Sequence, residues 1–267
     1  MRVLSTLDVE KHGSCILVYG PTGSGKTRSA LTLPDPICYI NKEPKDPRLV
    51  HASVEHGKKI TYYEADGFND MMEFLHEQVM LASKGQCEFE SFFHDGLTFS
   101  ASVYRNLLED DRYKANLMED PNSKKYPRPG MVDRFNMEQK DWGILSSMMA
   151  RETYLLNKLS KFGKVVVSTA IDAEFPKWNQ SIRIAPALMG KEFPKLIHGY
   201  FDLIGYIVVP FHVIDGKIIT PRVSFISPDD GLSNSYMARS NEKLAEAELK
   251  MGPPPLDWSK ILKVIGR

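Results

Sequence analysis

The stretch Gly20-Pro21-Thr22-Gly23-Ser24-Gly25-Lys26-Thr27 (GPTGSGKT) directly follows an apolar run at residues 15–19, CILVY. It matches the pattern G-x-x-x-x-G-K-[ST] at every defined position. From ordinary residue frequencies, a chance match somewhere in a chain of this length is on the order of 1%. The stretch therefore predicts a phosphate-binding loop between a buried strand and a helix, rather than a plain glycine-rich turn.

The chemistry of this loop comes from its glycines and from two side chains. Glycines let backbone N–H groups turn inward around an anion, and the N-terminus of a following helix adds positive potential. Lys26 is placed to reach the β- and γ-phosphates, and the hydroxyl of Thr27 to bind Mg²⁺. Residues 28–33 are expected to continue as a helix that Pro34 ends. The residues expected to bind the nucleotide are Gly20, Pro21, Thr22, Gly23, Ser24, Gly25, Lys26, Thr27 and Arg28.

The composition is that of an ordinary globular domain and excludes several functional classes. The chain has 267 residues, with 34 Lys+Arg and 34 Asp+Glu, so its formal net charge is zero. This balance excludes a polybasic nucleic-acid coat and an acidic tail, and leaves a local basic groove open. No apolar run approaches the roughly 18 residues of a membrane helix, and residues 1–13 lack the apolar core of a secretory signal. The cysteines show no C-x-x-C spacing, which indicates reduced thiols and a cytoplasmic protein.

Short apolar runs alternate with helical patterns along the chain, which is typical of a mostly parallel α/β sheet flanked by helices. A helix is expected at residues 68–83, where apolar side chains recur at helical spacing. A last strand at residues 222–226 is expected to pair with residues 217–219, as a late antiparallel pair. The expected strands before it lie at residues 15–19, 37–40, 59–63, 89–94, 164–171, 203–209 and 217–219.

One domain is expected to occupy residues 1–250, with a polar insertion at about residues 109–141 that carries PNSKKYPRPG. Residues 251–267 begin with a stiff MGPPP spacer and continue as a short amphipathic helix. This helix either docks on the domain or contacts a partner subunit. Its apolar face is formed by Trp258, Ile261, Leu262 and Ile265.

A carboxylate on a neighbouring strand is the second requirement of a nucleotide–Mg²⁺ site. The segment FESFFHD ends in Asp95, which is placed to hold Mg²⁺ through water; the alternative is an Asp that only starts a turn with Gly96. Glu43 follows the strand at residues 37–40, at the sheet edge where ligands bind, and is the candidate to activate the attacking water. The segment Asn41-Lys42-Glu43-Pro44 lacks the aspartate of the guanine-reading N-K-x-D signature, so we expect ATP rather than GTP.

These pieces occur in an order that resembles the RecA-like P-loop ATPases. More closely, they resemble the phage-type nucleotide-binding family that includes the Sak-type single-strand-annealing ATPases, over roughly residues 13–244. Besides the loop and the acidic residue after the next strand, the resemblance is carried by FFHDGLTFSA, KVVVSTAI, RIAPALMGKEFPKLIHGYFDLIGYI and SNSYMARSNEKL. The last segment departs from the family's Ala-Lys-Asp-Arg element, because this chain has Ala238-Arg239-Ser240-Asn241. The fold that the resemblance implies is a RecA-like P-loop NTPase.

The resemblance also implies roles for three residues. Glu43 corresponds to the catalytic carboxylate, and Thr169, on the strand after Asp95, to a sensor of the γ-phosphate. Lys191, after Gly190, corresponds to a cation that reaches the nucleotide of a neighbouring subunit and stabilises transition-state charge. Many relatives have a His soon after the sensor strand, where this chain has Ile171-Asp172.

A homo-oligomer, either a ring or a filament, is the assembly that the resemblance implies. If a phage encodes the chain, we expect it in the host cytoplasm, with a phage single-strand-binding or recombination protein as a candidate partner.

Two segments lie where RecA-like proteins carry loops that contact DNA. Cations in such loops follow phosphates, and an exposed Trp can stack on a base for about 1–3 kcal/mol. The alternative is that the Trp packs on the domain and the cations are only solvated. The residues in question are Lys124, Lys125, Arg128, Lys177, Trp178 and Arg183.

Three functions remain open on these observations. The first is an ATP-dependent protein that binds single-stranded DNA in phage-type recombination or annealing. The second is an assembly or regulatory ATPase that acts without DNA. The third is a small-molecule P-loop kinase, in which Arg112, Arg128 and Arg134 of the polar insertion would belong to a lid over the phosphates. The Gly190-Lys191 segment and the sensor-like strand favour the first two.

Overall fold

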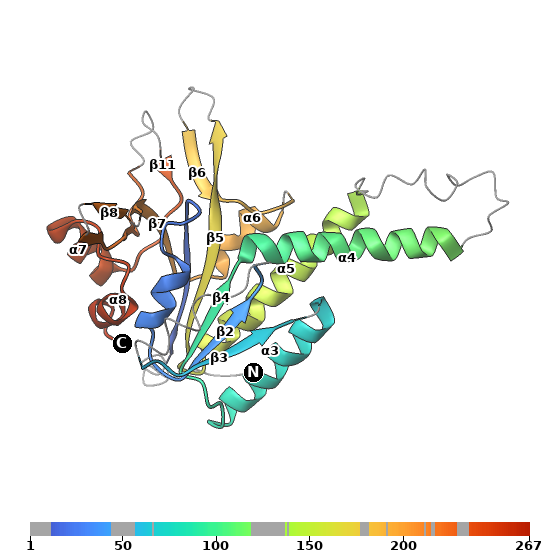
Figure 1. Ribbon diagram of the computed structural model, residues 1–267, viewed down its shortest axis with the longest axis horizontal. Helices are drawn as coiled ribbons and strands as arrows, with labels where there is room; N and C mark the ends of the chain where they lie inside the picture. The colour runs from blue at the N-terminus through green and yellow to red at the C-terminus, as the bar shows by residue number, and fades with distance from the viewer. Residues whose placement is uncertain are drawn as a thin grey trace.

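A central sheet of nine strands organises the protein in a computed structural model, counting the residues that the structure describes. These are residues 12–43, 57–65, 67–118, 137, 139–176, 182–190, 192–210, 212–214, 217–228 and 235–267. Seven of the strands are β1 (Ser14–Gly20), β2 (Ile37–Asn41), β3 (Ile60–Glu64), β4 (Ser91–Asp95), β5 (Val165–Pro176), β7 (Leu203–Val209) and β10 (Arg222–Ser224). They follow one another in the spatial order β10-β7-β1-β5-β4-β2-β3 (Figure 1).

Six of these seven strands are parallel, and only the edge strand β10 runs antiparallel, to β7. Every residue of β1, β2 and β4 is buried. A parallel sheet is covered on both faces, so its central strands read as continuous apolar runs, such as CILVY in β1. The carboxyl ends of the parallel strands meet at one edge of the sheet, and the glycine-rich loop leaves β1 at that edge.

Helices cover the two faces of the sheet and divide the core into two clusters (Figure 1). One face is covered by α3 (Phe68–Ser83), α4 (Leu97–Met118) and α5 (Gln139–Ser160), and the other by η1 (Thr27–Thr32) and α8 (Trp258–Val264). The alternation of side chains along β1 shows the division, because Leu17 packs in the first cluster and Ile16 and Val18 pack in the second.

The remaining elements extend the edges of this core. β5 continues beyond its parallel neighbours and forms an antiparallel hairpin with β6 (Ile182–Pro186), which also pairs with β11 (Ser235–Tyr236). β6 and β11 are the other two of the nine strands. A separate antiparallel pair is formed by β8 (His212–Ile214) and β9 (Lys217–Ile219). The short helices α6 (Phe193–Leu196) and η2 (Ile197–Gly199) precede β7, and α7 (Glu242–Met251) precedes the proline-rich segment. None of the helices in the described ranges has the length and apolar character needed to span a bilayer.

The mostly parallel sheet, its flanking helices and a late antiparallel pair are confirmed, but the expected partner of residues 222–226 is wrong. β9 pairs with β8, while β10 pairs with β7. The outer edge of β10 is occupied by the proline-rich segment, since the N–H of Val223 donates to the carbonyl of Pro254. The outer edge of β10 is therefore not open to β9.

The polar insertion expected at about residues 109–141 begins and ends in helices. α4 continues to Met118 and α5 begins at Gln139. Figure 1 shows both helices running out beyond the sheet, so their outer turns have no sheet to bury against. At residues 139–144 of α5 no side chain is buried, so these turns lack the apolar periodicity from which a helix is recognised.

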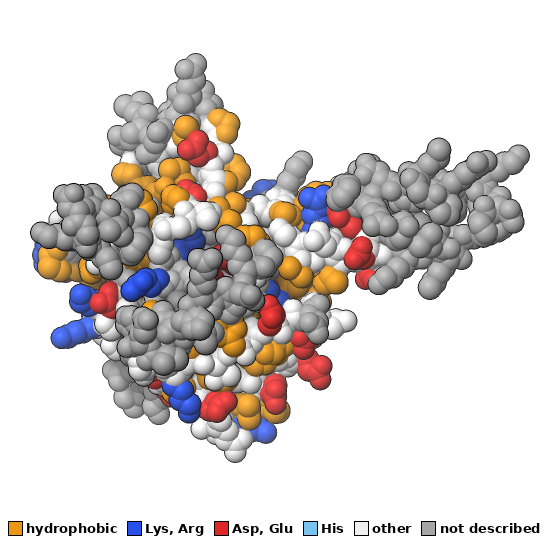
Figure 2. Space-filling view, viewed as in Figure 1, with side chains coloured by type: hydrophobic (Ala, Val, Ile, Leu, Met, Phe, Trp, Pro, Cys, Tyr) orange, Lys and Arg blue, Asp and Glu red, His pale blue; other side chains and the backbone are white. Residues whose placement is uncertain are grey.

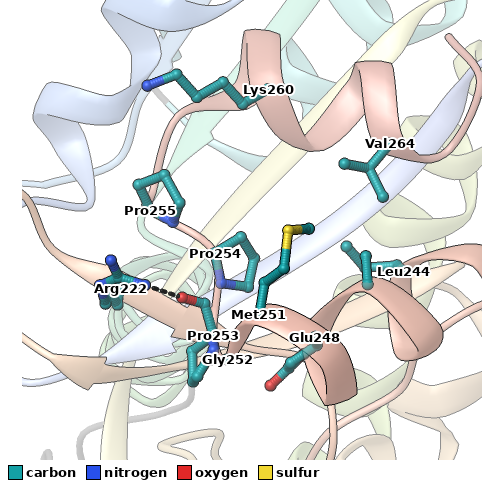
Figure 3. Close-up of a pocket in the computed structure, with 11 residues that line it drawn as sticks. Arg222, Leu244, Glu248, Met251, Gly252, Pro253, Pro254, Pro255, Lys260 and Val264 are labelled. Atoms are coloured by element: carbon teal, nitrogen blue, oxygen red, sulfur yellow. Dashed lines mark hydrogen bonds between the residues drawn. The ribbon is translucent and has the colours of Figure 1, made fainter.

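The C-terminal segment docks on the domain, which is one of the two alternatives expected from the sequence. Trp258 is fully buried, and its indole Nε1 donates to Ser29 Oγ of η1 at 2.9 Å. Its backbone N–H donates to Thr32 Oγ1 at 2.8 Å. Figure 3 shows the preceding prolines against the sheet edge, where Arg222 Nη1 donates to the carbonyl of Pro253 at 2.6 Å. Trp258, Ile261 and Leu262 of α8 are thus part of the core that supports the glycine-rich loop.

We expect the substitution Trp258→Ala to lower the free energy of unfolding by about 3–5 kcal/mol, the usual cost of removing a buried aromatic side chain. Urea unfolding of the full chain measures the change. The matched control is Leu249→Ala on α7, where the side chain is 77% exposed; we expect a change within about 0.5 kcal/mol there. Equal losses in the two variants would show that α8 does not support the core.

Candidate functional site

The loop between β1 and η1 curls back at the carboxyl edge of the sheet. Gly23 and Gly25 have φ angles of 78° and 93°, in the left-handed region that favours glycine. The helix expected at residues 28–33 is present as η1, a 3₁₀ helix of six residues. Its N-terminus therefore adds less positive potential than that of a long α-helix, and the loop amides and Lys26 carry more of the anion attraction.

Lys26 closes the mouth of the loop. Its Nζ donates to the carbonyls of Gly20 and Pro21, both at 2.8 Å, and lies 3.4 Å from Ser24 Oγ. Burial lowers the pKa of the Lys26 ammonium, and the nearby charges of Asp95, Asp172 and Glu43 oppose that shift. Three carboxylates therefore act on one ammonium at this edge of the sheet.

Asp95 is the acceptor on which the site converges. Thr27 Oγ1 donates to Asp95 Oδ2 at 2.7 Å, and Thr169 Oγ1 donates to Asp95 Oδ1 at 2.6 Å. Tyr39 OH also donates to Asp95 Oδ2. Asp95 is 1% exposed, so these hydroxyls replace the water that its carboxylate would otherwise bind. One side chain on β4 thus connects the glycine-rich loop, β2 and β5.

The register of the strands explains this convergence. β5 lies between β1 and β4, and it places Thr169 beside Val18 of β1. β2 flanks β4 on the other side, and Tyr39 lies in it opposite Phe93. Side chains on alternate residues point to the same face, so Tyr39, Asp95 and Thr169 all leave the sheet on the η1 side.

Tyr39 enters the site as a protonated phenol. Its pKa is raised by burial and by the charge of Asp95, so the hydroxyl remains a donor over the whole physiological range. The ring stacks between Tyr62, with centroids 4.7 Å apart, and Phe93, with centroids 5.4 Å apart. The strand prediction placed Tyr39 in the core, and nothing in the local sequence signalled its contact with Asp95.

Glu43 lies two residues beyond β2 and is half-buried. Its backbone N–H donates to Asn41 Oδ1 at 3.2 Å, and its charge acts on Lys26. The backbone N–H of the preceding Lys42 donates to the carbonyl of Asp95 at 2.9 Å, which ties the ends of β2 and β4 together. The carboxylate expected to activate water is therefore at the same edge as the loop.

Asp172 was not among the residues expected in the site. It lies on β5, three residues after Thr169, and its charge acts on Lys26. Tyr206 OH of β7 donates to Asp172 Oδ2 at 3.5 Å. An acidic residue that follows the apolar run KVVVSTAI was the available signal, since a charge at the end of a buried parallel strand faces the ligand edge.

Several of the expected site residues are not brought together with this cluster. Arg28 is exposed at the start of η1, and Arg183 is exposed on β6. Lys124, Lys125, Arg128, Lys177, Trp178 and Lys191 lie outside the described residues.

No protein-family model matches the chain. No curated protein matches it at a significant level.

We expect Tyr39→Phe to lower the free energy of unfolding by about 1.5–3 kcal/mol, because the buried carboxylate of Asp95 loses a charge-assisted hydrogen bond. Urea unfolding at neutral pH measures it. Tyr154→Phe on α5 is the control, since that ring is 50% exposed; there we expect less than about 0.5 kcal/mol. If Tyr39→Phe were as mild as the control, the phenol would not be holding Asp95.

Proposed function

We propose that the protein is an ATP-binding ATPase of the RecA-like type. The observation that carries the proposal is the 2.7 Å contact between Thr27 Oγ1 and Asp95 Oδ2, because it joins the last residue of the glycine-rich loop to the carboxylate on β4. Phosphate loops use a hydroxyl and a strand-end carboxylate as a pair around Mg²⁺. A glycine-rich turn with no ligand has no need of such a pair.

The donor set fits Mg²⁺ together with a nucleotide. Mg²⁺ prefers oxygen ligands and is held by one or two protein groups, with water and phosphate oxygens completing its shell. Thr27 and Asp95 supply one hydroxyl and one carboxylate. Within the described residues no group of three or more His, Cys, Asp or Glu side chains is placed to hold a metal ion. Bound there, Mg²⁺ would neutralise charge on the phosphate oxygens.

Each remaining side chain has a role in this proposal. Lys26 exchanges the carbonyls of Gly20 and Pro21 for phosphate oxygens. Thr169, between the loop and Asp95, contacts the γ-phosphate, and Glu43 accepts a proton from the attacking water. Lys191 of a neighbouring subunit supplies a further cation. The proposal therefore assigns binding to the loop and hydrolysis to the ends of β2 and β5.

We expect Lys26→Ala to weaken the binding of a fluorescent ATP analogue by about 100-fold, since two charge-assisted hydrogen bonds are lost at about 1.5 kcal/mol or more each. Binding is measured by titration in the presence of Mg²⁺. The control is Lys250→Ala on α7, where the side chain is 76% exposed and binding should not change. Undiminished binding by Lys26→Ala would reject the loop as the nucleotide site.

The proposed role of the ATPase is in phage-type recombination or annealing on single-stranded DNA. Two features support it beyond the resemblance. The β5–β6 hairpin extends from the edge of the sheet that carries Thr169, so Thr169 and the hairpin share one strand (Figure 1). Hydrophobic side chains gather near the base of this hairpin in Figure 2. Phe175 and Arg183 lie opposite each other toward the far end of the hairpin. Phe175 is 46% exposed and Arg183 is exposed, so a stacking ring and a cation are both available to a strand.

We expect single-stranded DNA to raise the rate of ATP turnover, and this stimulation to fade as salt rises from about 50 to 200 mM, because phosphate contacts release counterions. Arg183→Ala should weaken the stimulation, while Arg151→Ala on the exposed side of α5 should not. ATP turnover without any stimulation would instead favour an assembly or regulatory ATPase. Phosphate transfer to an acceptor other than water would favour the kinase.

A further inference from the structure

A second buried polar cluster lies on the opposite side of β4 from Asp95. His94 and Asp95 are consecutive, so their side chains leave the strand on opposite faces. His94 Nε2 lies 3.2 Å from Glu152 Oε1 of α5 and 3.2 Å from Ser100 Oγ of α4. The side chains of His94 and Glu152 are both fully buried. One strand end therefore joins the candidate nucleotide site to the α4–α5 helices.

Lys42 enters the same cluster from the end of β2. The residue is 6% exposed, and its Nζ lies 5.6 Å from the centroid of the Tyr104 ring on α4. Burial lowers the pKa of Lys42, while the charges of Glu152 and of Asp70 on α3 oppose that shift. The pKa of Glu152 is lowered in turn, because the attraction of His94 and Lys42 outweighs the burial that alone would raise it. Glu152 is thus the anionic centre of a cluster built from β2, β4, α4 and α5.

The backbone connects this cluster directly to the candidate site. Lys42 is followed by Glu43, and its N–H donates to the carbonyl of Asp95. Gly96, with a φ angle of 117°, makes the turn from Asp95 into α4. A Cβ at Gly96 would lie 3.4 Å from the Cβ of Lys42 and 3.0 Å from the ring of Phe99. A shift of α4 or α5 would therefore displace the ends of both β2 and β4.

The cluster is only partly satisfied by hydrogen bonds. Two of its buried atoms, Lys42 Nζ and His94 Nδ1, have no hydrogen-bond partner among the described residues. A buried network in this condition is costly, and small movements of its members change its energy strongly. Such a network is suited to sense the position of the helices that carry it. Figure 1 shows those helices, α4 and α5, reaching past the sheet.

We propose that Glu152 is a positioning residue for the nucleotide site. Through His94 and Lys42 it holds the ends of β4 and β2, and so sets where Asp95 and Glu43 stand relative to the loop. The α4–α5 pair is thereby coupled to hydrolysis. This proposal rests on the proposed ATPase function, but its structural part, that Glu152 orders these strand ends, is testable without ATP.

The test compares Glu152→Gln, Lys42→Met and the double variant in the full chain. We expect the Kd for the ATP analogue to stay within about threefold of wild type, while kcat falls by about 10- to 100-fold, since a displaced catalytic group loses rate before it loses binding. The double variant removes both charges, and its kcat should fall by a much smaller factor than the product of the two single-variant factors. Because the double variant leaves neither Lys42 nor Glu152 as an unpaired buried charge, it can still be tested if the single variants fold poorly.

Thr153→Val is the matched control, because Thr153 is a fully buried neighbour on α5 whose hydroxyl donates to its own helix, at Met149 O. It should lower stability without changing kcat. Hydrogen exchange of the Lys42 backbone amide gives a readout independent of ATP. Glu152→Gln should speed this exchange more than Thr153→Val does, when each variant is measured equally far below its own unfolding midpoint.

Two outcomes would overturn the proposal: wild-type kcat in folded Glu152→Gln, or equal exchange rates in the two variants. If the wild-type protein did not bind or hydrolyse ATP, the proposed function would fail, and the exchange rates would still decide whether Glu152 orders the strand ends.

Discussion

The carboxylate of Asp95 accepts hydrogen bonds from Thr27, Tyr39 and Thr169, and the arrangement of the site depends on that convergence. A buried carboxylate is tolerated only when its oxygens are satisfied. The three hydroxyls meet this need, and in doing so they hold the glycine-rich loop, β2 and β5 in one relative position. The strand order with β5 between β1 and β4 is what brings Thr169 within reach.

The same strand end serves two polar clusters because neighbouring residues on a strand face opposite ways. Asp95 faces the loop, and His94 faces Glu152 across the sheet. On the loop side, Trp258 supports η1 from behind, so a segment near the C-terminus stabilises the loop near the N-terminus. The candidate site is therefore held between two cores, one below the loop and one beneath α4 and α5.

Residues with a short-range signal could be predicted, and those without one could not. Lys26 and Thr27 follow from the spacing of one octapeptide, and Asp95 from an acid that ends a predicted strand. Tyr39 and Glu152 carry no such signal, because a Tyr in a strand and a Glu in a helix are ordinary in those elements. Their importance comes from partners far along the chain, Asp95 for Tyr39 and His94 for Glu152.

The alternation of apolar runs with helical patterns was enough to establish an α/β protein with a mostly parallel sheet, since parallel strands that are buried on both faces are mostly apolar. The loop after β1 could likewise be predicted, because its chemistry depends on neighbouring residues in the sequence. Only the tertiary structure revealed the neighbour of β10, the helical ends of the polar insertion and the second polar cluster. Each depends on which segments compete for the same edge or face, and this competition is settled by contacts between residues far apart in the chain.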